Sequence, residues 1–209
     1  MEHQESFELW QAFADMHELT DAQLDAFKLY YHELVRQNEL FNITAITQLK
    51  SVLAYHFSDS LALGRCRDLS EANLIVDVGS GGGFPSFPLK IKYPHLHIVA
   101  VEVNNKKADF LEDMAIKLGM DNVIVNRYDW RNFLRKTSYQ SDYVVARASL
   151  APDELMRMFR PSSAYRQAKL VYWASKDWTN DGMPEHTLVE ACVYSVGSRT
   201  HKLVFLGEK

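Results

Sequence analysis

Helical periodicity dominates the hydrophobic and polar pattern of the first seventy residues. Thr20 and Gln23 form a capping-box pattern, and apolar side chains follow at helical spacing through residues 24–35. A second stretch with the same period covers residues 48–63. Such stripes are typical of amphipathic helices that pack one face against a core. We therefore predict a helical extension over residues 1–70.

From residue 73 onward, short apolar runs alternate with helical stretches. Alternating strands and helices build a mostly parallel sheet with helices on both faces. The last two apolar runs have no helix between them, which predicts an antiparallel C-terminal hairpin. Residues 71–209 therefore predict a Rossmann-like α/β domain. The predicted strands are 74–78, 97–103, 122–126, 142–146, 170–174, 189–196 and 201–205, and the predicted helices are 84–93, 105–118 and 152–166.

The composition is that of an ordinary globular protein, with 47% hydrophobic and 24% charged residues. The formal net charge of −4 hides an asymmetry, because residues 1–72 carry −7 and residues 73–209 carry +3. Within the second part, residues 127–176 carry +6 and interleave arginines with aromatic side chains. This distribution excludes a uniformly basic coat for nucleic acid but not a local basic face. For Arg157, Arg160 and Arg166, a phosphate-binding face and an ordinary solvated face are equally open.

Targeting signals and cysteines point to a cytoplasmic protein. No apolar run approaches the length of a membrane span, and the acidic start argues against export. The two cysteines, Cys66 and Cys192, form no close pair in the sequence. Their spacing argues against a zinc site or any other metal centre, and against a fold built on disulfides.

A glycine-rich turn carries the most specific chemical signal. Residues 77–85 read D-V-G-S-G-G-G-F-P and lie between a predicted strand and a predicted helix. Glycine permits a tight turn and close approach of a ligand to the backbone, and the N–H groups at a helix start favour an anion. Glu102 ends the next strand, nineteen residues after Gly83. A carboxylate in that place can accept hydrogen bonds from both ribose hydroxyls of a nucleoside.

The glycine spacing distinguishes between nucleoside cofactors. A dinucleotide fingerprint of the form G-x-G-x-x-G/A would need its third glycine at Phe84 or at Ser86, so neither register fits. The observed D-x-G-x-G-x-G resembles motif I of the S-adenosylmethionine-dependent methyltransferases. The alternative, a glycine turn required only for packing, does not account for the coupled Glu102.

A closer resemblance extends over residues 24–176. Here the chain resembles the GidB/RsmG family, the bacterial 16S ribosomal RNA guanine-N7 methyltransferases. Residues 77–89 resemble the family run D-V-G-S-G-x-G-F-P-G-x-P-L. Further matching segments are Asn38 with F-N-I-T-A-I at 41–46, H-x-x-D-S at 56–60, K-K-x-x-F-L at 106–111, R-Y-D at 127–129 and A-R-A at 146–148.

The chain also departs from the family pattern at several positions. Ser86 stands where the family has glycine, and Tyr55 stands where it has arginine. Asn104-Asn105 replaces Leu-Gly. At residues 175–177 the chain reads S-K-D instead of L-K-G, so Lys176 is kept while both of its neighbours change.

The resemblance implies a class I methyltransferase fold that binds S-adenosyl-L-methionine. It implies 16S rRNA or a small ribosomal subunit particle as the partner, with no membrane, no DNA and a monomeric state favoured. Glycine contacts would hold the methionine portion, Glu102 the ribose, and Tyr128 and Asp129 the adenine. Arg147 and Lys176 are the residues expected to serve the transfer, with Arg147 orienting the substrate. The residues implied to bind the cofactor are Gly79, Gly81, Gly83, Phe84, Glu102, Tyr128, Asp129 and Arg147.

The implied reaction needs no general base. Guanine N7 carries a lone pair and no proton, so an in-line displacement depends mainly on positioning and exclusion of water. Two other functions stay open: a methyltransferase with a small-molecule or protein acceptor, and a cofactor-binding module without transferase activity. His56 and Asp59 lie at i and i+3 of a predicted helix. They either line the RNA or cofactor cleft or tie the extension to the sheet.

Overall fold

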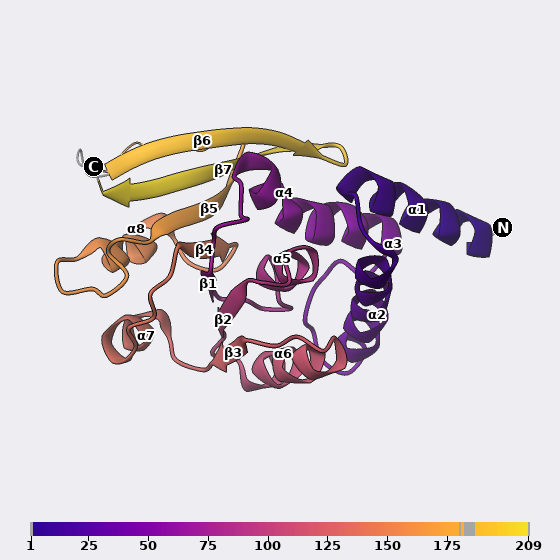
Figure 1. Ribbon diagram of the computed structural model, residues 1–209, viewed down its shortest axis with the longest axis horizontal. Coiled ribbons are helices and arrows are strands. Elements are labelled where there is room, and N and C mark those ends of the chain that lie inside the picture. The colour runs from indigo at the N-terminus through magenta and orange to yellow at the C-terminus, as the bar shows by residue number, and fades with distance from the viewer. Residues whose placement is uncertain (1, 180, 182–186, 209) are drawn as a thin grey trace.

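The computed structural model describes residues 2–179, 181 and 187–208. Within them a seven-stranded sheet has the order β3-β2-β1-β4-β5-β7-β6 (Figure 1). Strands β1 to β5 run parallel, and β7 runs antiparallel to both β5 and β6. The predicted sheet and hairpin are confirmed. The strands are β1 Leu74–Val78, β2 His97–Val101, β3 Val123–Asn126, β4 Tyr143–Arg147, β5 Lys169–Ser175, β6 Thr187–Val196 and β7 Arg199–Glu208.

The helices cover both faces of this sheet (Figure 1). The predicted capping box is present, since Thr20 accepts a hydrogen bond from the Gln23 backbone and Gln23 reaches back. Helix α7 was not predicted from the sequence. The helices are α1 Glu2–His17, α2 Asp21–Asn38, α3 Leu49–Val52, the π-helix η1 Leu53–Ser58, α4 Asp59–Cys66, α5 Ser86–Lys92, α6 Asn105–Lys117, α7 Trp130–Lys136, α8 Pro152–Leu155 and the 3-10 helix η2 Met156–Phe159.

Two hydrophobic clusters lie on opposite faces of the sheet. Alternate residues of a strand point to opposite faces, so Ile75 joins one cluster and Val76 the other. The first cluster contains side chains from α1 to α6 and the second those of α7, α8 and η2. Because Phe57 of the extension shares a cluster with Ile75 and Phe205, the extension packs directly on the sheet. The division of the chain into an N-terminal helical extension over residues 1–70 and a methyltransferase domain over residues 71–209 stays a prediction.

The helix predicted over residues 152–166 was wrong in its length. Regular helix ends at Leu155, and a single 3-10 helix follows to Phe159. Pro161 is the reason, because the residue before a proline is driven out of the helical region. Arg160 accordingly adopts an extended conformation with φ −63° and ψ 146°. The following residues form turns that lead into β5.

The sequence analysis did not anticipate a bond between the two cysteines. Cys66 at the end of α4 and Cys192 in β6 form a disulfide with 6.1 Å between their Cα atoms. Spacing along the sequence does not limit pairing when the fold brings two elements together, and here β6 passes beside α4. An ion pair between Arg67 and Glu190 lies near the same junction. The extension is therefore covalently attached to the hairpin.

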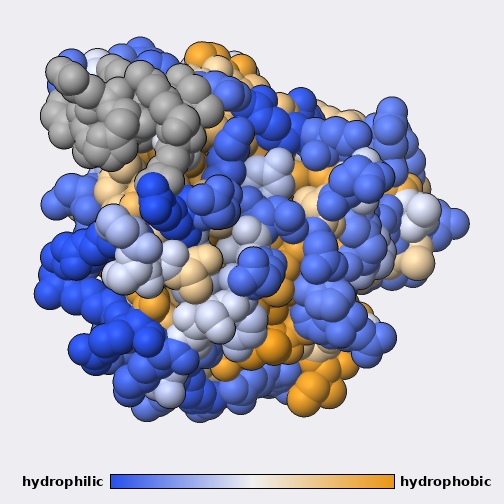
Figure 2. Space-filling view, turned by 60° about the vertical axis from the view of Figure 1, so that its left-hand side comes forward, coloured by the Kyte–Doolittle hydropathy of each residue, from blue (hydrophilic) through white to orange (hydrophobic). Residues whose placement is uncertain are grey.

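The surface is mainly hydrophilic on the side that carries α7 and α8. Figure 2 turns this side forward and shows a band of hydrophobic side chains between hydrophilic ones. No helix among the described residues is long and apolar enough to cross a membrane.

Candidate active site

The glycine turn after β1 uses backbone conformations that other residues rarely adopt. Gly79, Gly81 and Gly83 have φ values of 74°, 57° and 93°. A Cβ atom at Gly79 would collide with the side chain of Ser149, and one at Gly83 would lie 2.5 Å from the Tyr30 hydroxyl. Conformation and crowding thus both require glycine at Gly79 and Gly83.

Asp77 supports the turn from inside the protein. Its Oδ2 accepts hydrogen bonds from the Ser86 Oγ at 2.6 Å and the Ser86 backbone N at 3.3 Å. Its Oδ1 has no partner among the described residues, and burial raises the pKa of this carboxyl to about 6. Ser86, which replaces a family glycine, therefore supplies hydrogen bonds that tie the start of α5 to β1.

Glu102 follows β2 and reaches the turn. Its Oε2 accepts from the Gly81 backbone N at 2.8 Å, and its Oε1 accepts from the Asn104 backbone N at 2.8 Å. Asn104 in turn caps α6 by accepting a hydrogen bond from the Lys107 backbone. The carboxylate is thereby held in one orientation.

The glycine turn and the Glu102 carboxylate border a cavity of about 450 Å³, here called the glycine cavity. It brings together seven of the eight residues predicted to bind the cofactor; Gly83 does not line it. Thr44 of the loop before α3 and His56 of η1 also line it. The predicted residues in the lining are Gly79, Gly81, Phe84, Glu102, Tyr128, Asp129 and Arg147.

Tyr128 and Asp129 form the far wall of the glycine cavity. Tyr128 is 40% exposed, and the Lys136 ammonium lies 4.7 Å from the centre of its ring. Asp129 is the N-cap of α7, where it accepts a hydrogen bond from the Asn132 backbone N at 2.9 Å. That bond lowers the pKa of Asp129. Asp129 therefore has a structural role that the sequence interpretation did not include.

Arg147 at the end of β4 joins the extension to the sheet. Its Nη1 donates to Asp59 Oδ2 at 2.9 Å and to the Tyr55 carbonyl at 3.2 Å. Its Nη2 lies 3.4 Å from the Nδ1 atom of His56. The His56 ring stacks on Phe84 with 4.4 Å between centroids, and the Arg147 guanidinium lies 5.3 Å from the centre of the Phe84 ring. His56 and Asp59 therefore tie the extension to the sheet through Arg147, and each also lines a cavity. That either cavity holds RNA or cofactor stays a prediction.

His56 is held in its neutral form. Burial, with Arg147 as the second cause, lowers the pKa of His56 to about 4. With Arg147 donating to Nδ1, the proton belongs on Nε2, which lies 2.8 Å from the Thr44 Oγ1. His56 thus connects Arg147 to the loop before α3 without adding a charge.

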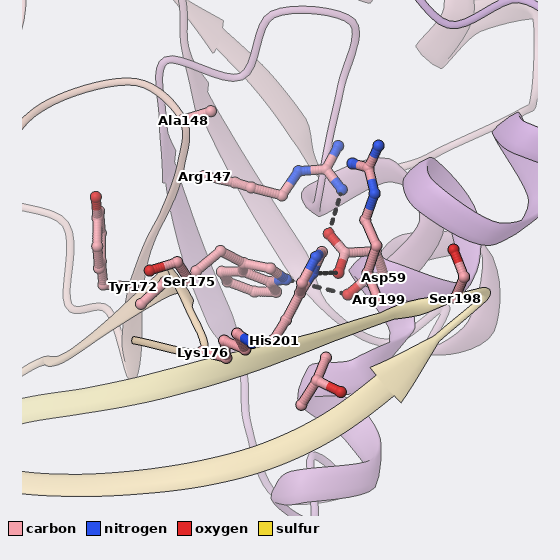
Figure 3. A pocket seen from close by; sticks show the side chains of 12 residues that line it. Asp59, Arg147, Ala148, Tyr172, Ser175, Lys176, Ser198, Arg199 and His201 are labelled. Carbon is pink, nitrogen blue, oxygen red and sulfur yellow. Dashed lines mark hydrogen bonds and ion pairs between the residues drawn. The ribbon is translucent and has the colours of Figure 1, made fainter. Parts of the chain in front are cut away.

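A second cavity of about 660 Å³, here called the hairpin cavity, shares Arg147 and Ala148 with the first. Asp59 lies in its wall and is only 4% exposed. The Oδ1 of Asp59 accepts from the Tyr194 hydroxyl at 2.7 Å and is 2.9 Å from His201 Nδ1. In Figure 3 the Asp59 carboxylate lies between the Arg147 guanidinium and the His201 ring. One buried carboxylate therefore binds groups from the sheet and from the hairpin.

Comparison with known proteins identifies the family. The profile of GidB, described as rRNA small subunit methyltransferase G, matches residues 23–183. The chain belongs to this family. A relative named ribosomal RNA small subunit methyltransferase G from an Exiguobacterium species is 34% identical over 197 residues, which cover 93% of this chain and 82% of that protein. The resemblance stated from the sequence is confirmed.

Other GidB relatives align over a smaller part of their length. Proteins of the same name are 41% identical in Aster yellows witches'-broom phytoplasma and 40% identical in Bacillus subtilis. The aligned part covers 66% of each chain in the first case, and 62% of this chain and 55% of the relative in the second. The chain thus spans between about half and four fifths of the length of these relatives.

Solved structures confirm the predicted fold. A putative methyltransferase from Escherichia coli superposes with a TM-score of 0.57 at 12% identity, covering 73% of this chain and 86% of that one. A SAM-dependent methyltransferase from Aquifex aeolicus gives 0.54 at 16% identity, covering 76% and 93%. At such identities the likeness concerns the fold alone.

Within this GidB chain, the two residues predicted to serve methyl transfer, Arg147 and Lys176, border the same cavity. Arg147 lines both cavities, whereas Lys176, which follows β5, lines only the hairpin cavity. Trp173 is 8% exposed and donates from Nε1 to the Asp59 carbonyl at 3.0 Å, so it is mainly a core residue. The S-K-D departure therefore lies at the hairpin cavity and away from the glycine turn.

Sequence reasoning missed three polar residues of this site. Tyr194 and His201 face each other across the hairpin and both bind Asp59. No sequence signal connects them to Asp59, which lies more than a hundred positions earlier. Thr44 belongs to the matched F-N-I-T-A-I motif, and its hydroxyl beside His56 gives that motif a physical role. Among the described residues, no three His, Cys, Asp or Glu side chains gather as a metal site requires.

Proposed function

We propose that this chain transfers a methyl group from S-adenosylmethionine to N7 of a guanine in 16S rRNA. The observation that carries the proposal is the shared wall of the two cavities. Arg147 and Ala148 border both the glycine cavity and the hairpin cavity. A donor in one and an acceptor base in the other would meet at Arg147.

The glycine cavity has the chemistry that the cofactor requires. The turn brings the backbone of Gly79 and Gly81 to the surface of the cavity, where the lack of side chains would let the methionine portion approach closely. The fixed Glu102 carboxylate would accept hydrogen bonds from the ribose hydroxyls. Tyr128 and Asp129 would flank the adenine, with Asp129 using the lone pairs that its capping role leaves free.

The hairpin cavity would hold the guanine and its adjoining phosphates. Lys176 and Arg199 line it and supply positive charge toward an RNA strand. Arg147 would orient the base through a hydrogen bond to O6 or through a phosphate. The partner in this proposal is 16S rRNA or a small-subunit particle, met by a monomer in the cytoplasm.

When bound, the cofactor supplies a sulfonium methyl group as the electrophile. Because guanine N7 carries no proton, none of the protein's groups needs to act as a base. Methylation leaves a positive charge on the guanine ring, which a free cation nearby would disfavour. The ion pair between Arg147 and Asp59 offsets the arginine charge, and His56 stays neutral at pH 7. Arg147 and His56 thus position the base without adding an unbalanced positive charge beside the product.

The decisive experiment supplies the purified protein with tritium-labelled cofactor and small-subunit RNA from cells that lack this enzyme. We expect label in the RNA as N7-methylguanosine, identified by mass spectrometry. The Arg147→Ala variant should lose about 10² in rate, the size typical of a lost positioning group. Arg36→Ala, on the exposed face of α2, is the control and should retain the wild-type rate.

Two other results would support the functions left open by the sequence. Label in a small molecule or a protein would assign a different acceptor. Tight cofactor binding without any transfer would make the chain a binding module. Wild-type turnover by Arg147→Ala would show that this residue does not orient the substrate.

A further inference from the structure

A third cavity, separate from the two described above, is lined mainly by arginine. It has a volume of about 450 Å³ and is here called the arginine cavity. Its lining contains no carboxylate, and Leu134 is its only apolar residue among those described. The lining residues are Arg131, Leu134, Arg135, Arg157, Arg160, Ser162 and Ser163.

The fold gathers these side chains from two separate segments. Arg131 and Arg135 lie four positions apart on α7 and therefore share one face of that helix. Arg157 lies in η2, and Arg160 follows where Pro161 ends the helix. The same proline that shortened the predicted helix turns the chain so that Ser162 and Ser163 complete the cavity.

One carboxylate organises two of the arginines from outside the lining. Glu154 accepts from the Arg131 Nε at 2.7 Å and Nη2 at 3.1 Å, and from the Arg157 Nε at 2.7 Å. These bonds lower the pKa of Glu154 to about 2, so it is ionised at neutral pH. Arg135 donates to a neutral partner, the Asn132 side chain. Glu154 thus pairs with two of the four guanidinium groups, and Asp129, which interacts electrostatically with Arg131 and Arg135, offsets part of the remaining charge. Four arginines against these two carboxylates leave an excess of positive charge at the cavity.

We propose that the arginine cavity binds a backbone phosphate of the RNA substrate. Guanidinium groups form paired hydrogen bonds with phosphate oxygens, and phosphate contacts fix the register of an RNA strand without reading its sequence. The cavity has no aromatic side chain that would stack a base, so a backbone phosphodiester fits it better than a free nucleotide. This inference rests on the proposed function, because it takes RNA as the partner.

The position of the cavity supports a continuous path for RNA. Helix α7 begins at Trp130, which lines the glycine cavity, and carries Arg131 and Arg135 in its next turns. The length of α7 is about 10 Å at the helical rise per residue, which is less than two extended nucleotides. In the view that brings this side forward, strongly hydrophilic side chains gather at the lower left (Figure 2). An RNA strand whose guanine lies at Arg147, which also borders the glycine cavity, can therefore reach the arginine cavity by passing along the glycine cavity.

The test compares two double variants that remove the same charge. Arg135→Gln with Arg160→Gln alters the cavity but leaves both Glu154 ion pairs in place. Lys28→Gln with Arg36→Gln removes two charges from α2 and is the matched control. For each protein we would measure the affinity for a fluorescent 16S rRNA fragment at several salt concentrations. Calorimetric titration with S-adenosylmethionine checks that the site is intact.

We expect the cavity variant to bind the fragment about tenfold more weakly at moderate salt, with a salt slope lower by about 0.7 for each lost phosphate contact. Its affinity for S-adenosylmethionine should be unchanged, and the α2 variant should match the wild type. Equal RNA affinity and equal slope in both variants would overturn the proposal. So would saturable binding of inorganic phosphate that depends on Arg135 and Arg160 while RNA affinity does not, because the cavity would then be a free-phosphate site.

The proposed function and this inference fail separately. If the wild type methylates RNA but the cavity variant binds RNA normally, only the arginine cavity is misassigned. If the wild type methylates no RNA, the proposed function fails, and a cavity-dependent RNA affinity still locates a phosphate site.

Discussion

Asp59 is the residue on which the candidate site depends most. Its two oxygens bind Arg147 from β4 and Tyr194 and His201 from the hairpin. A buried carboxylate is stable only when charged and polar partners satisfy it, and here three do. The Tyr194 hydroxyl acts as a donor, because burial and the nearby Asp59 raise its pKa well above the usual value.

Replacing Asp59 by asparagine should therefore cost both stability and rate. The amide keeps the shape but leaves the Arg147 charge buried without its partner. We expect a loss of about 3 kcal/mol in the free energy of unfolding, typical of a broken buried ion pair. Urea denaturation and methyl transfer would measure the two effects. The control is Asp68→Asn, which changes an exposed carboxylate in a turn. An unchanged free energy of unfolding for Asp59→Asn would show that the site does not depend on the Asp59 carboxylate.

Glu102 gives a prediction about the cofactor alone. Its carboxylate accepts two backbone hydrogen bonds and is expected to accept more from ribose. The Glu102→Gln variant loses charge-assisted bonds, and its affinity for S-adenosylmethionine should fall by about 10-fold or more. Calorimetry measures this directly, and Glu112→Gln on the exposed face of α6 serves as the comparison. Equal affinities would remove Glu102 from the cofactor site.

At the scale of elements, the sequence predicted what local pattern determines. The strand–turn–helix unit around residues 77–89 and the nearby Glu102 lie close together in the chain, so their pattern predicted both the fold and residues that line the glycine cavity. Helix α7 has only seven residues, too few for a periodic signal, and was missed. The π-helix η1 interrupts a stretch that the sequence predicts as one regular helix. It was missed because its wider turn does not change the pattern of hydrophobic residues.

Contacts between distant elements were beyond prediction for a different reason. Tyr194, His201 and the Cys66–Cys192 bond depend on where the hairpin lies against α4, and that placement follows from packing of the entire sheet. The sequence therefore predicted the glycine cavity better than the hairpin cavity.

The docking of α1 should depend on pH. His17 at its end is buried, and its Nε2 lies 2.8 Å from the Ser58 Oγ in η1. Burial, then Arg65 and Lys92, lowers the pKa of His17 to about 4. The folded-state pKa of His17 lies below its unfolded value of about 6.5. The contribution of neutral His17 to the free energy of unfolding is therefore complete above pH 6.5 and is lost as the pH falls toward 4.

We therefore expect the difference in unfolding free energy between the wild type and His17→Gln to shrink between pH 7 and pH 4.5. The shift corresponds to at most about 3 kcal/mol. Urea denaturation at both pH values measures it, and His56 titrates equally in both proteins. A difference that does not change with pH would mean that His17 is not held neutral by its burial.

At the scale of the whole molecule, the fold separates charges that the sequence only averages. The acidic excess belongs to the extension, and the basic residues gather around β4, β5 and α7. A net charge of −4 is thus compatible with a surface that approaches RNA from one side.

The disulfide affects the stability of the whole molecule, because it closes a loop that contains most of the chain. Cys66 and Cys192 are 126 positions apart. A cross-link over so long a loop is expected to contribute about 5 kcal/mol, chiefly by restricting the unfolded chain. Reduction of the wild type should lower the unfolding free energy by that order, and the Cys66→Ser/Cys192→Ser variant should show no further change. Equal stability of oxidised and reduced wild type would contradict this.

The strand order has a consequence for the order of synthesis. Strand β6 precedes β7 in the chain, yet β7 lies between β5 and β6 in the sheet. As the chain leaves the ribosome, β6 therefore appears before the strand to which it pairs. The nascent protein can complete β1 to β5 early. Strand β6, which carries Cys192 and Tyr194, can join the sheet only after β7 has been synthesised. The hairpin cavity thus becomes complete later in translation than the glycine cavity.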